Sequence, residues 1–222
     1  MSTTAAEPPR ARPRRKVSGR LVGAVLVVLV VALMALDTTY KDPDEAITAG
    51  GRPAFDPQQY GEETYPKAVS TLEENAQPLP ELAAALAKDP DAAGEQFGNR
   101  AGNSPYAFPV TAEGVAGKAE NGVLPLKVKG VPKDVTVSVQ VGPALPGTAI
   151  RDAVGFIEFG QFVNQVEYAD AATALNNQVK AQVLEGLDPA SLEGKRVEVL
   201  GAFAYLAPTV VTITPVKLEA AS

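Results

Sequence analysis

Residues 21–36 form an apolar run in which no side chain is polar. A run of this length is stable in a lipid bilayer or in the channel that handles signal peptides. Basic side chains precede the run, and the positive-inside rule holds them on the cytoplasmic side. These are Arg10, Arg12, Arg14, Arg15, Lys16 and Arg20. The pattern predicts a transmembrane helix over 21–37, a signal anchor with the N-terminus in the cytosol.

A cleavable signal peptide is the alternative, because Leu33-Met34-Ala35 resembles a small-residue cleavage region. Leu33 and Met34 are larger than the residues that signal peptidase prefers, which favours the uncleaved anchor. Attachment through an acylated cysteine is excluded, because the chain contains no cysteine.

The net charge has opposite signs before and after the apolar run. The first twenty residues carry six basic side chains and one acid, a charge of +5, so the rest of a chain with net charge −6 carries −11. An acidic outer portion repels phosphate, and no nucleic acid partner is predicted. Residues 1–20 are rich in Pro, Ala and Arg, which is typical of a disordered cytoplasmic tail beside anionic lipid. Membrane lipid is therefore a predicted partner, through 21–37.

Neither cysteine nor histidine is present. Their absence excludes Cys/His zinc sites, thiol nucleophiles, disulfides and Ser-His-Asp triads, and the sequence predicts no metal and no cofactor. Acidic residues that could form a carboxylate pair for glycoside hydrolysis are Asp152, Glu158, Glu167 and Asp170. Acidic residues more often lie on a solvated face, so we expect a protein that is not an enzyme.

Beyond the span, residues 38–55 contain several Pro and Gly and are predicted to be a linker. The extracytoplasmic domain is predicted over 56–222. Its first helix starts at Asp56-Pro57, with Pro66 expected to interrupt it. A second helix is predicted over 80–88, where Asp89-Pro90 ends it.

Alternating patterns and turns follow. Residues 106–119 are predicted as one strand, Asn121-Gly122 as a hairpin turn, and 123–128 as its partner. In residues 135–141 apolar and polar side chains alternate, which predicts a strand with one buried face. Residues 149–159 are predicted to continue the sheet.

The last third of the chain is predicted to hold a helix over 168–187 and two strands, over 196–206 and 210–218. Several strands, a helix and two more strands resemble the order of an OB-type barrel, which often carries its helix between the third and fourth strands. The predicted fold class is therefore α+β, a small OB-like antiparallel barrel with helices. An open antiparallel sheet packed on helices is the alternative.

One group of polar residues is a candidate ligand site. Its members are Arg151, Asp152, Asn164, Gln165 and Tyr168. A sugar or a polar peptide is bound by such guanidinium, carboxylate, amide and phenol groups. The structural interpretation, which we favour, is that Arg151 pairs with Asp152 or Glu167, Asn164 caps a helix and Tyr168 packs on the barrel. On a strand, Arg151 and Asp152 would face opposite sides.

Phe156, Phe159 and Phe162 recur at a spacing of three. They could form a platform for sugar stacking, but a core stripe at the junction with the following helix is the favoured interpretation.

Several segments of the outer portion carry a family resemblance. They are Phe55-Asp56-Pro57 with the acidic stretch to Tyr65, the segment 82–94, Ser104-Pro105-Tyr106, the segment 147–153 and the segment 159–169. Together they closely resemble the DUF2291 family of predicted bacterial periplasmic lipoproteins. The resemblance implies an envelope protein whose relatives are often encoded near sugar ABC-transporter components. This chain departs from the lipoprotein pattern because it lacks the acylated cysteine.

Two functions are consistent with these observations. One is a membrane-anchored accessory protein that binds a transporter or another envelope protein. The other is a module that binds a small polar, sugar-like ligand near Arg151 and Tyr168. A concave polar pocket with a buried Arg151 would favour the second function, and an exposed apolar patch or a groove without a cavity would favour the first.

Overall fold

The structure is a computed structural model that describes residues 28–30, 32–34 and 54–221. The predicted tail 1–20, most of the predicted span 21–37 and nearly all of the linker 38–55 lie outside these residues. Residues 28–30 and 32–34 are helical. Among the residues that the structure describes, no helix is both long and apolar enough to cross a membrane. The segment Phe55–Ser222 is a compact unit of its own.

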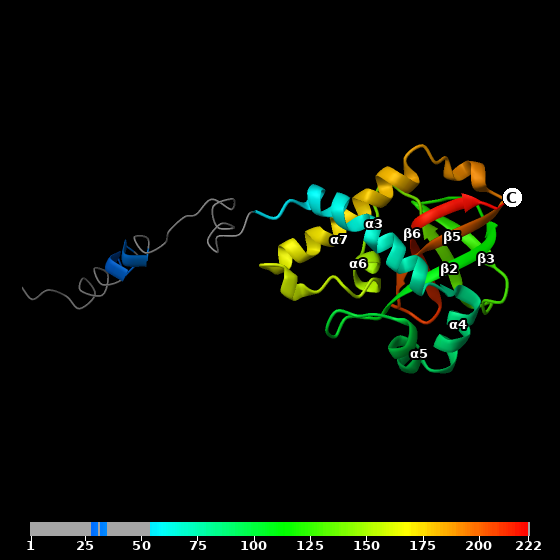
Figure 1. Cartoon of the computed structure of the whole chain (residues 1–222), viewed down its shortest axis with the longest axis horizontal. Coiled ribbons are helices and arrows are strands. Elements are labelled where there is room, and N and C mark those ends of the chain that lie inside the picture. The colour runs from blue at the N-terminus through cyan, green and yellow to red at the C-terminus, as the bar shows by residue number, and fades with distance from the viewer. Residues whose placement is uncertain (1–27, 31, 35–53, 222) are drawn as a thin grey trace, which may run out of the picture. The chain divides into compact units, whose positions relative to one another are not determined.

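Five strands of this unit close into a barrel (Figure 1). They are β2 (Ala107–Ala116), β3 (Val123–Val128), β4 (Thr136–Gln140), β5 (Arg196–Ala204) and β6 (Val210–Ala220). Neighbours follow the order β2-β3-β4-β6-β5, and β5 pairs back onto β2 in antiparallel register. The pair β4–β6 is parallel, and the other pairs are antiparallel. This closure confirms the OB-like prediction, and the open-sheet alternative is wrong.

The turn between β2 and β3 has the conformation that its sequence predicts. Asn121 and Gly122 have φ angles of 52° and 79°, the two positive values that a tight hairpin turn needs. The strand predicted over 123–128 is present with the same bounds.

Three helices precede the barrel strands: α3 (Pro57–Asn75), α4 (Leu79–Lys88) and α5 (Pro90–Phe97). The Oδ1 atom of Asp56 caps α3 by accepting hydrogen bonds from two backbone amides. The predicted interruption at Pro66 is wrong, because α3 continues through it. Pro66 is on the exposed face, where water can solvate the carbonyl that loses its helical partner.

The helix α4 ends at Lys88 as predicted, and the Asp89 side chain then caps α5, which the sequence analysis did not predict. The short strand β1 (Gln77–Pro78) joins α3 to α4 and pairs in parallel with β2.

Between β4 and β5 the chain forms α6 (Ala149–Ala153), the turn η2 (Phe159–Gln161) and α7 (Gln165–Val179). The predicted strand over 149–159 is wrong, since α6 is a helix with all five residues buried. A short segment buried on every side has no periodicity that separates a helix from a strand. The helix α7 starts at Gln165, three residues earlier than predicted, and Asn164 is its cap.

After α7 the chain continues as η3 (Lys180–Leu184), a π-helical turn, and then as η4 (Pro189–Leu192), a 3₁₀ turn. Gly186, with a φ of 79°, lies between them and follows the end of the helical segment.

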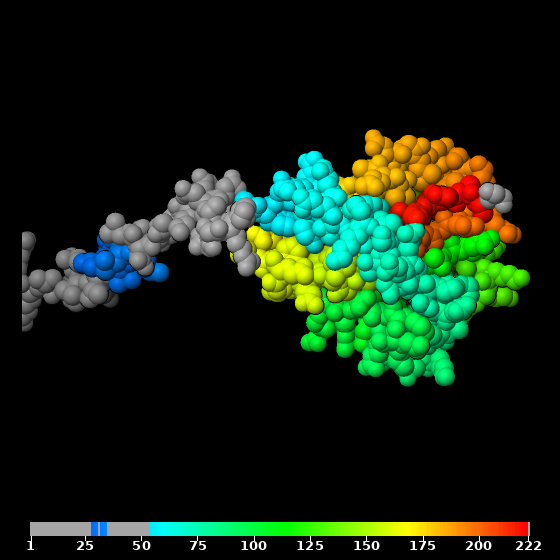
Figure 2. Space-filling view, in the orientation of Figure 1, coloured from blue at the N-terminus to red at the C-terminus, as the bar shows by residue number. Residues whose placement is uncertain are grey.

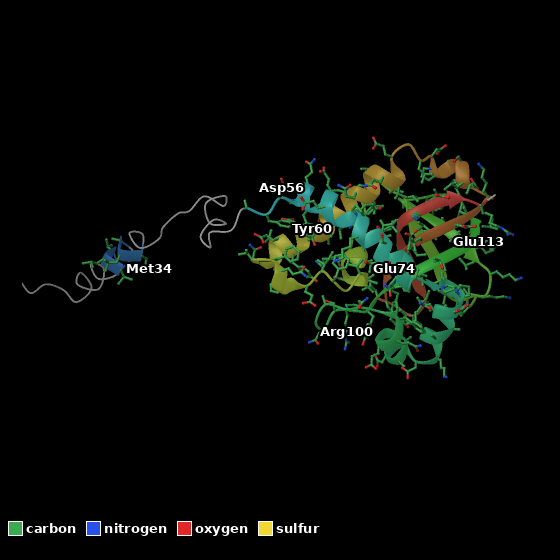
Figure 3. All side chains as sticks on the ribbon, in the orientation of Figure 1. Met34, Asp56, Tyr60, Glu74, Arg100 and Glu113 are labelled. Atoms are coloured by element: carbon green, nitrogen blue, oxygen red, sulfur yellow. The ribbon has the colours of Figure 1, made fainter. Side chains whose placement is uncertain are left out.

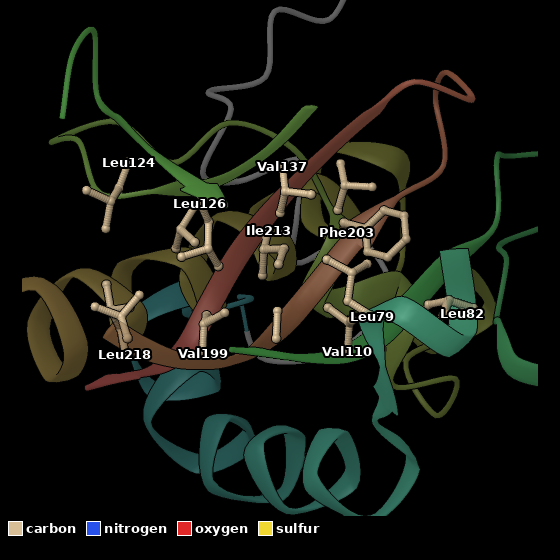
Figure 4. Close-up of a cluster of buried hydrophobic side chains, with 14 of the residues drawn as sticks. Leu79, Leu82, Val110, Leu124, Leu126, Val137, Val199, Phe203, Ile213 and Leu218 are labelled. Carbon is tan, nitrogen blue, oxygen red and sulfur yellow. The ribbon is translucent and has the colours of Figure 1, made fainter. Parts of the chain in front are cut away.

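Two apolar cores lie on the two faces of the barrel wall. The first fills the barrel and is closed at one end by Leu79 and Leu82 of α4 (Figure 4). The second lies outside the wall, under α3, α6 and α7. Along β5 the side chains alternate between them, with Phe203 inside the barrel and Leu200 and Ala202 facing the helices. This alternation explains why β5 is buried on both faces beneath the helices.

Candidate functional site

Arg151 is buried, and its guanidinium group is occupied by contacts within the domain. Its Nε and Nη2 atoms lie 2.8 and 2.7 Å from Oδ1 of Asp152. Its Nη1 atom donates to the backbone carbonyl of Tyr168 at 2.9 Å. The guanidinium carbon lies 3.6 Å from the centre of the Tyr168 ring, a cation–π contact.

Asp152 is equally buried, and it accepts a second hydrogen bond from the Thr148 hydroxyl at 2.6 Å. The two charges can lie side by side because α6 places neighbouring residues about 100° apart, whereas a strand would separate them by a half turn. Arg151, Asp152, Thr148 and Tyr168 thus form one buried polar cluster that joins α6 to α7. We call it the α6–α7 cluster.

Asn164 and Glu167 order the start of α7. The Oδ1 atom of Asn164 accepts from the amides of Val166 and Glu167, at 2.8 and 2.9 Å. The Oε2 atom of the buried Glu167 accepts from the amide of Val163 at 3.0 Å. Gln165 is exposed and is not part of this arrangement. The contacts of Arg151 with Asp152 and of Asn164 with the helix amides match the structural interpretation.

Tyr168 packs against aromatic rings, with Phe159 at 5.6 Å and Phe162 at 5.4 Å between ring centres. Burial raises the pKa of its hydroxyl, and the positive charge of Arg151 opposes that rise. The hydroxyl lies near the side chains of Arg151 and Asp152, but among the described residues none has the geometry of a hydrogen bond to it. That atom is the one feature of the α6–α7 cluster that would suit a bound polar group.

A groove lies elsewhere, on the outer wall of the barrel. It has a volume of about 950 Å³, and its walls come from β2, β5, β6, the end of β3 and the two prolines that flank the start of α4. None of the five predicted site residues lines this groove. It begins where the helices that cover the wall end, so that the outward positions of β2, β5 and β6 change from apolar to charged. We call it the barrel groove.

Three glutamates form a row across the barrel groove. Glu113 of β2 is directly opposite Glu198 of β5, which is directly opposite Glu219 of β6. Like charges at such positions repel each other, and nearby cations offset part of the cost. Arg196 lies 3.1 Å from Glu113, and Lys217 pairs with Glu73 of α3.

The barrel groove therefore presents carboxylates along its middle and cations beside them, all solvated. Among the described residues, no group of three or more acidic side chains converges closely enough to hold a metal ion. Such a surface suits a partner that is itself charged or polar. It differs from the usual OB binding face, which centres on the second and third barrel strands, here β3 and β4.

Sequence reasoning missed the barrel groove for a physical reason. Glu113 and Glu198 occupy outward positions in predicted strands and Glu219 directly follows another, but more than eighty residues separate the first two in the chain. Only the register of three strands brings them together, and a single sequence does not contain that register.

A second, smaller depression of about 380 Å³ lies between α4 and the turn that joins β5 to β6. Its lining is mainly apolar, with Leu79, Leu86 and Tyr205 among its residues.

Comparison with known proteins gives one family and one fold. The family described as "Predicted periplasmic lipoprotein (DUF2291)" matches residues 24–219. An OB-fold protein from Thermotoga maritima, known from its crystal structure, is similar with a TM-score of 0.63 and 22% sequence identity. The alignment covers 76% of this chain and all of that protein, and it supports the OB fold alone. A comparison with curated proteins finds no match.

The match over nearly the whole chain confirms the resemblance seen in the sequence, and it indicates an extracytoplasmic protein associated with the cell envelope. The chain belongs to the DUF2291 family of predicted periplasmic lipoproteins.

Proposed function

We propose that this protein is a membrane-anchored, non-enzymatic accessory protein of the envelope, and that its barrel groove binds a protein partner. The observation that carries the proposal is the open, charge-lined groove on the outer wall of the barrel. The polar cluster that the sequence singled out is closed by internal contacts, whereas the charges of the groove face solvent. A folded partner can approach a solvated groove without disturbing the core.

The proposed partner is a subunit of a solute transporter. Support comes from the family resemblance, since relatives are often encoded near sugar ABC-transporter components. A partner that carries Lys or Arg opposite the glutamate row, and acids opposite Lys127 and Lys129, would match the charges that line the groove.

Site-specific photo-crosslinking in native membranes tests this proposal. A photoreactive residue in place of Val115, which lines the barrel groove and is 45% exposed, is expected to capture a transporter subunit. The matched control is the same residue in place of Glu95, which is exposed on α5, outside the groove. Adding Glu198→Lys should remove most of the product at Val115, because it puts a positive charge in the middle of the glutamate row. Equal capture at positions 115 and 95, or none at 115, would count against the groove.

The anchor is a separate part of the proposal. The polar-free run and the basic leader support an uncleaved helix over 21–37, which would take the place of the missing lipid-modified cysteine. Protease added to spheroplasts is expected to digest the domain and to leave the Arg-rich tail protected. N-terminal sequencing of the mature protein should find residues 1–36 still present. A mature chain that begins near Leu36 or Asp37 would show a signal peptide, and a protected C-terminus would reverse the orientation.

A second candidate function is the binding of a small polar, sugar-like ligand near Arg151 and Tyr168. It is favoured by the buried Tyr168 hydroxyl, which has no partner among the described residues. It requires the α6–α7 cluster to open, because Asp152 and a backbone carbonyl already occupy the Arg151 guanidinium. The barrel groove needs no such rearrangement, and for that reason we prefer it.

A further inference from the structure

Exposed apolar side chains gather at the start of α7. Phe159 is 52% exposed, Val163 57% and Val166 68%. Within residues 54–221 the other large apolar side chains of comparable exposure are Val115, Leu206 and Val210, which lie on the barrel strands and their turn. We call residues 159–166 the apolar tip. Phe159, expected in a core stripe, instead lies half exposed at this tip, and Phe162 is the buried member.

The apolar tip carries no charge, although the portion of the chain beyond the apolar run carries −11. Of the two acidic residues that flank the tip in the chain, Glu158 is exposed, whereas Glu167 is buried and accepts a hydrogen bond from the Val163 amide. Its carboxylate is therefore withdrawn from the surface. An uncharged apolar patch on an acidic domain is typical of a surface that meets an apolar phase or a partner.

Folding of the domain does not account for the exposed residues of the tip. An apolar residue just before a helix cap usually packs on the fourth helical residue, which here would place Val163 on Tyr168. The Tyr168 ring packs with Phe159, Phe162 and Arg151, and Val163 remains 57% exposed. Val166, in the first turn of α7, also points away from the core.

The chain enters the domain beside this tip. The ring of Phe55, at the start of the compact unit, lies 5.6 Å from the ring of Phe162, and Tyr60 of α3 lies 5.7 Å from it. Figure 2 shows the beginning of α3 in cyan next to the yellow segment that begins α7, away from the red C-terminal strand. Residues 37–54, which connect the apolar run to Phe55, span at most about 60 Å even when fully extended.

We propose that the apolar tip inserts into the headgroup region of the bilayer that anchors the chain. This inference rests on the proposed anchor at 21–37. Exposed Phe and Val side chains gain free energy when they leave water for that region, and residues 159–166 bring no charge that would have to be dehydrated there. Glu113, in the barrel groove, and Tyr60, near the tip, lie toward opposite ends of the domain (Figure 3). Insertion of the tip would therefore direct the groove away from the membrane.

Tryptophan fluorescence tests the proposal, because the chain has no tryptophan of its own. Val166→Trp in the full chain, reconstituted into phosphatidylcholine vesicles, provides a single probe at the tip. We expect blue-shifted emission and loss of most of the fluorescence when the lipid is replaced by lipid brominated on its acyl chains. The matched control is Leu206→Trp, which is 78% exposed in the turn after β5, and its emission should remain that of a solvated indole.

Each outcome decides the proposal. Flotation of the same samples with the vesicles reports the anchor separately from the tip. If the chain floats with the vesicles but the probe at 166 remains solvated, the anchor holds and the tip proposal is wrong. If that probe is blue-shifted but bromine does not quench it, a protein surface such as a second copy covers the tip, and lipid is not the occupant. If the chain does not float, the anchor itself fails, and the tip proposal fails with it.

Discussion

Arg151→Ala is expected to lower the free energy of unfolding by about 3 to 5 kcal/mol, because it leaves the buried Asp152 carboxylate without its cation. The side chains of this pair are only 8% and 7% exposed, so solvent screens the interaction little. A domain is stable by about 5 to 15 kcal/mol, so the variant should lose much of its stability. Urea denaturation followed by circular dichroism measures the loss.

Two control variants show which part of this loss comes from the buried position of Arg151. Arg100→Ala removes a guanidinium that also lies over a tyrosine ring, 4.4 Å from the centre of Tyr106, but Arg100 is exposed. It should cost about 1 kcal/mol or less. Tyr168→Phe removes only a hydroxyl that has no hydrogen-bond partner among the described residues, and should leave stability nearly unchanged. An Arg151→Ala protein that keeps its stability but loses ligand or partner capture would assign Arg151 to binding instead.

The sequence predicted the barrel well where local chemistry determines the structure. The hairpin at Asn121-Gly122 requires two positive φ angles, which these residues adopt readily, and its partner strand has the predicted bounds. The cap Asp56 likewise specifies the start of α3, because its side chain accepts from the first free amides. Such signals lie within a few residues of each other, and one sequence contains them completely.

The sequence failed where the structure depends on distant partners. Ala149–Ala153 has no exposed face because α3, α7 and the barrel wall surround it, so its pattern does not identify a helix. The pairing of Arg151 with Asp152 or Glu167 was still predicted, although a strand would have placed Arg151 and Asp152 on opposite faces. The barrel groove depends on the register of β2, β5 and β6, which is set by the packing of the whole barrel.

Gly201→Ala is expected to destabilise the domain by about 3 kcal/mol, the upper end of the usual cost of overpacking. Gly201 lies in β5 at the register shift where β6 contains an extra residue. A methyl group there would overlap the backbone carbonyl of Thr214 and lie 2.8 Å from a methyl carbon of Ile213. Rotation of a side chain cannot relieve contact with backbone, so β5 and β6 must separate where the barrel bends.

Gly160→Ala is the matched control, because no atom lies within 4 Å of the position its methyl group would take. Both variants replace Gly with Ala. The control should keep the free energy of unfolding within about 0.5 kcal/mol of that of the parent protein. Urea denaturation of the two variants beside the parent compares the costs directly. If Gly201→Ala matched the control in stability, the close approach of β5 and β6 at Thr214 would be wrong. The bulge would then not be the feature that lets this short wall of strands curve into a closed barrel.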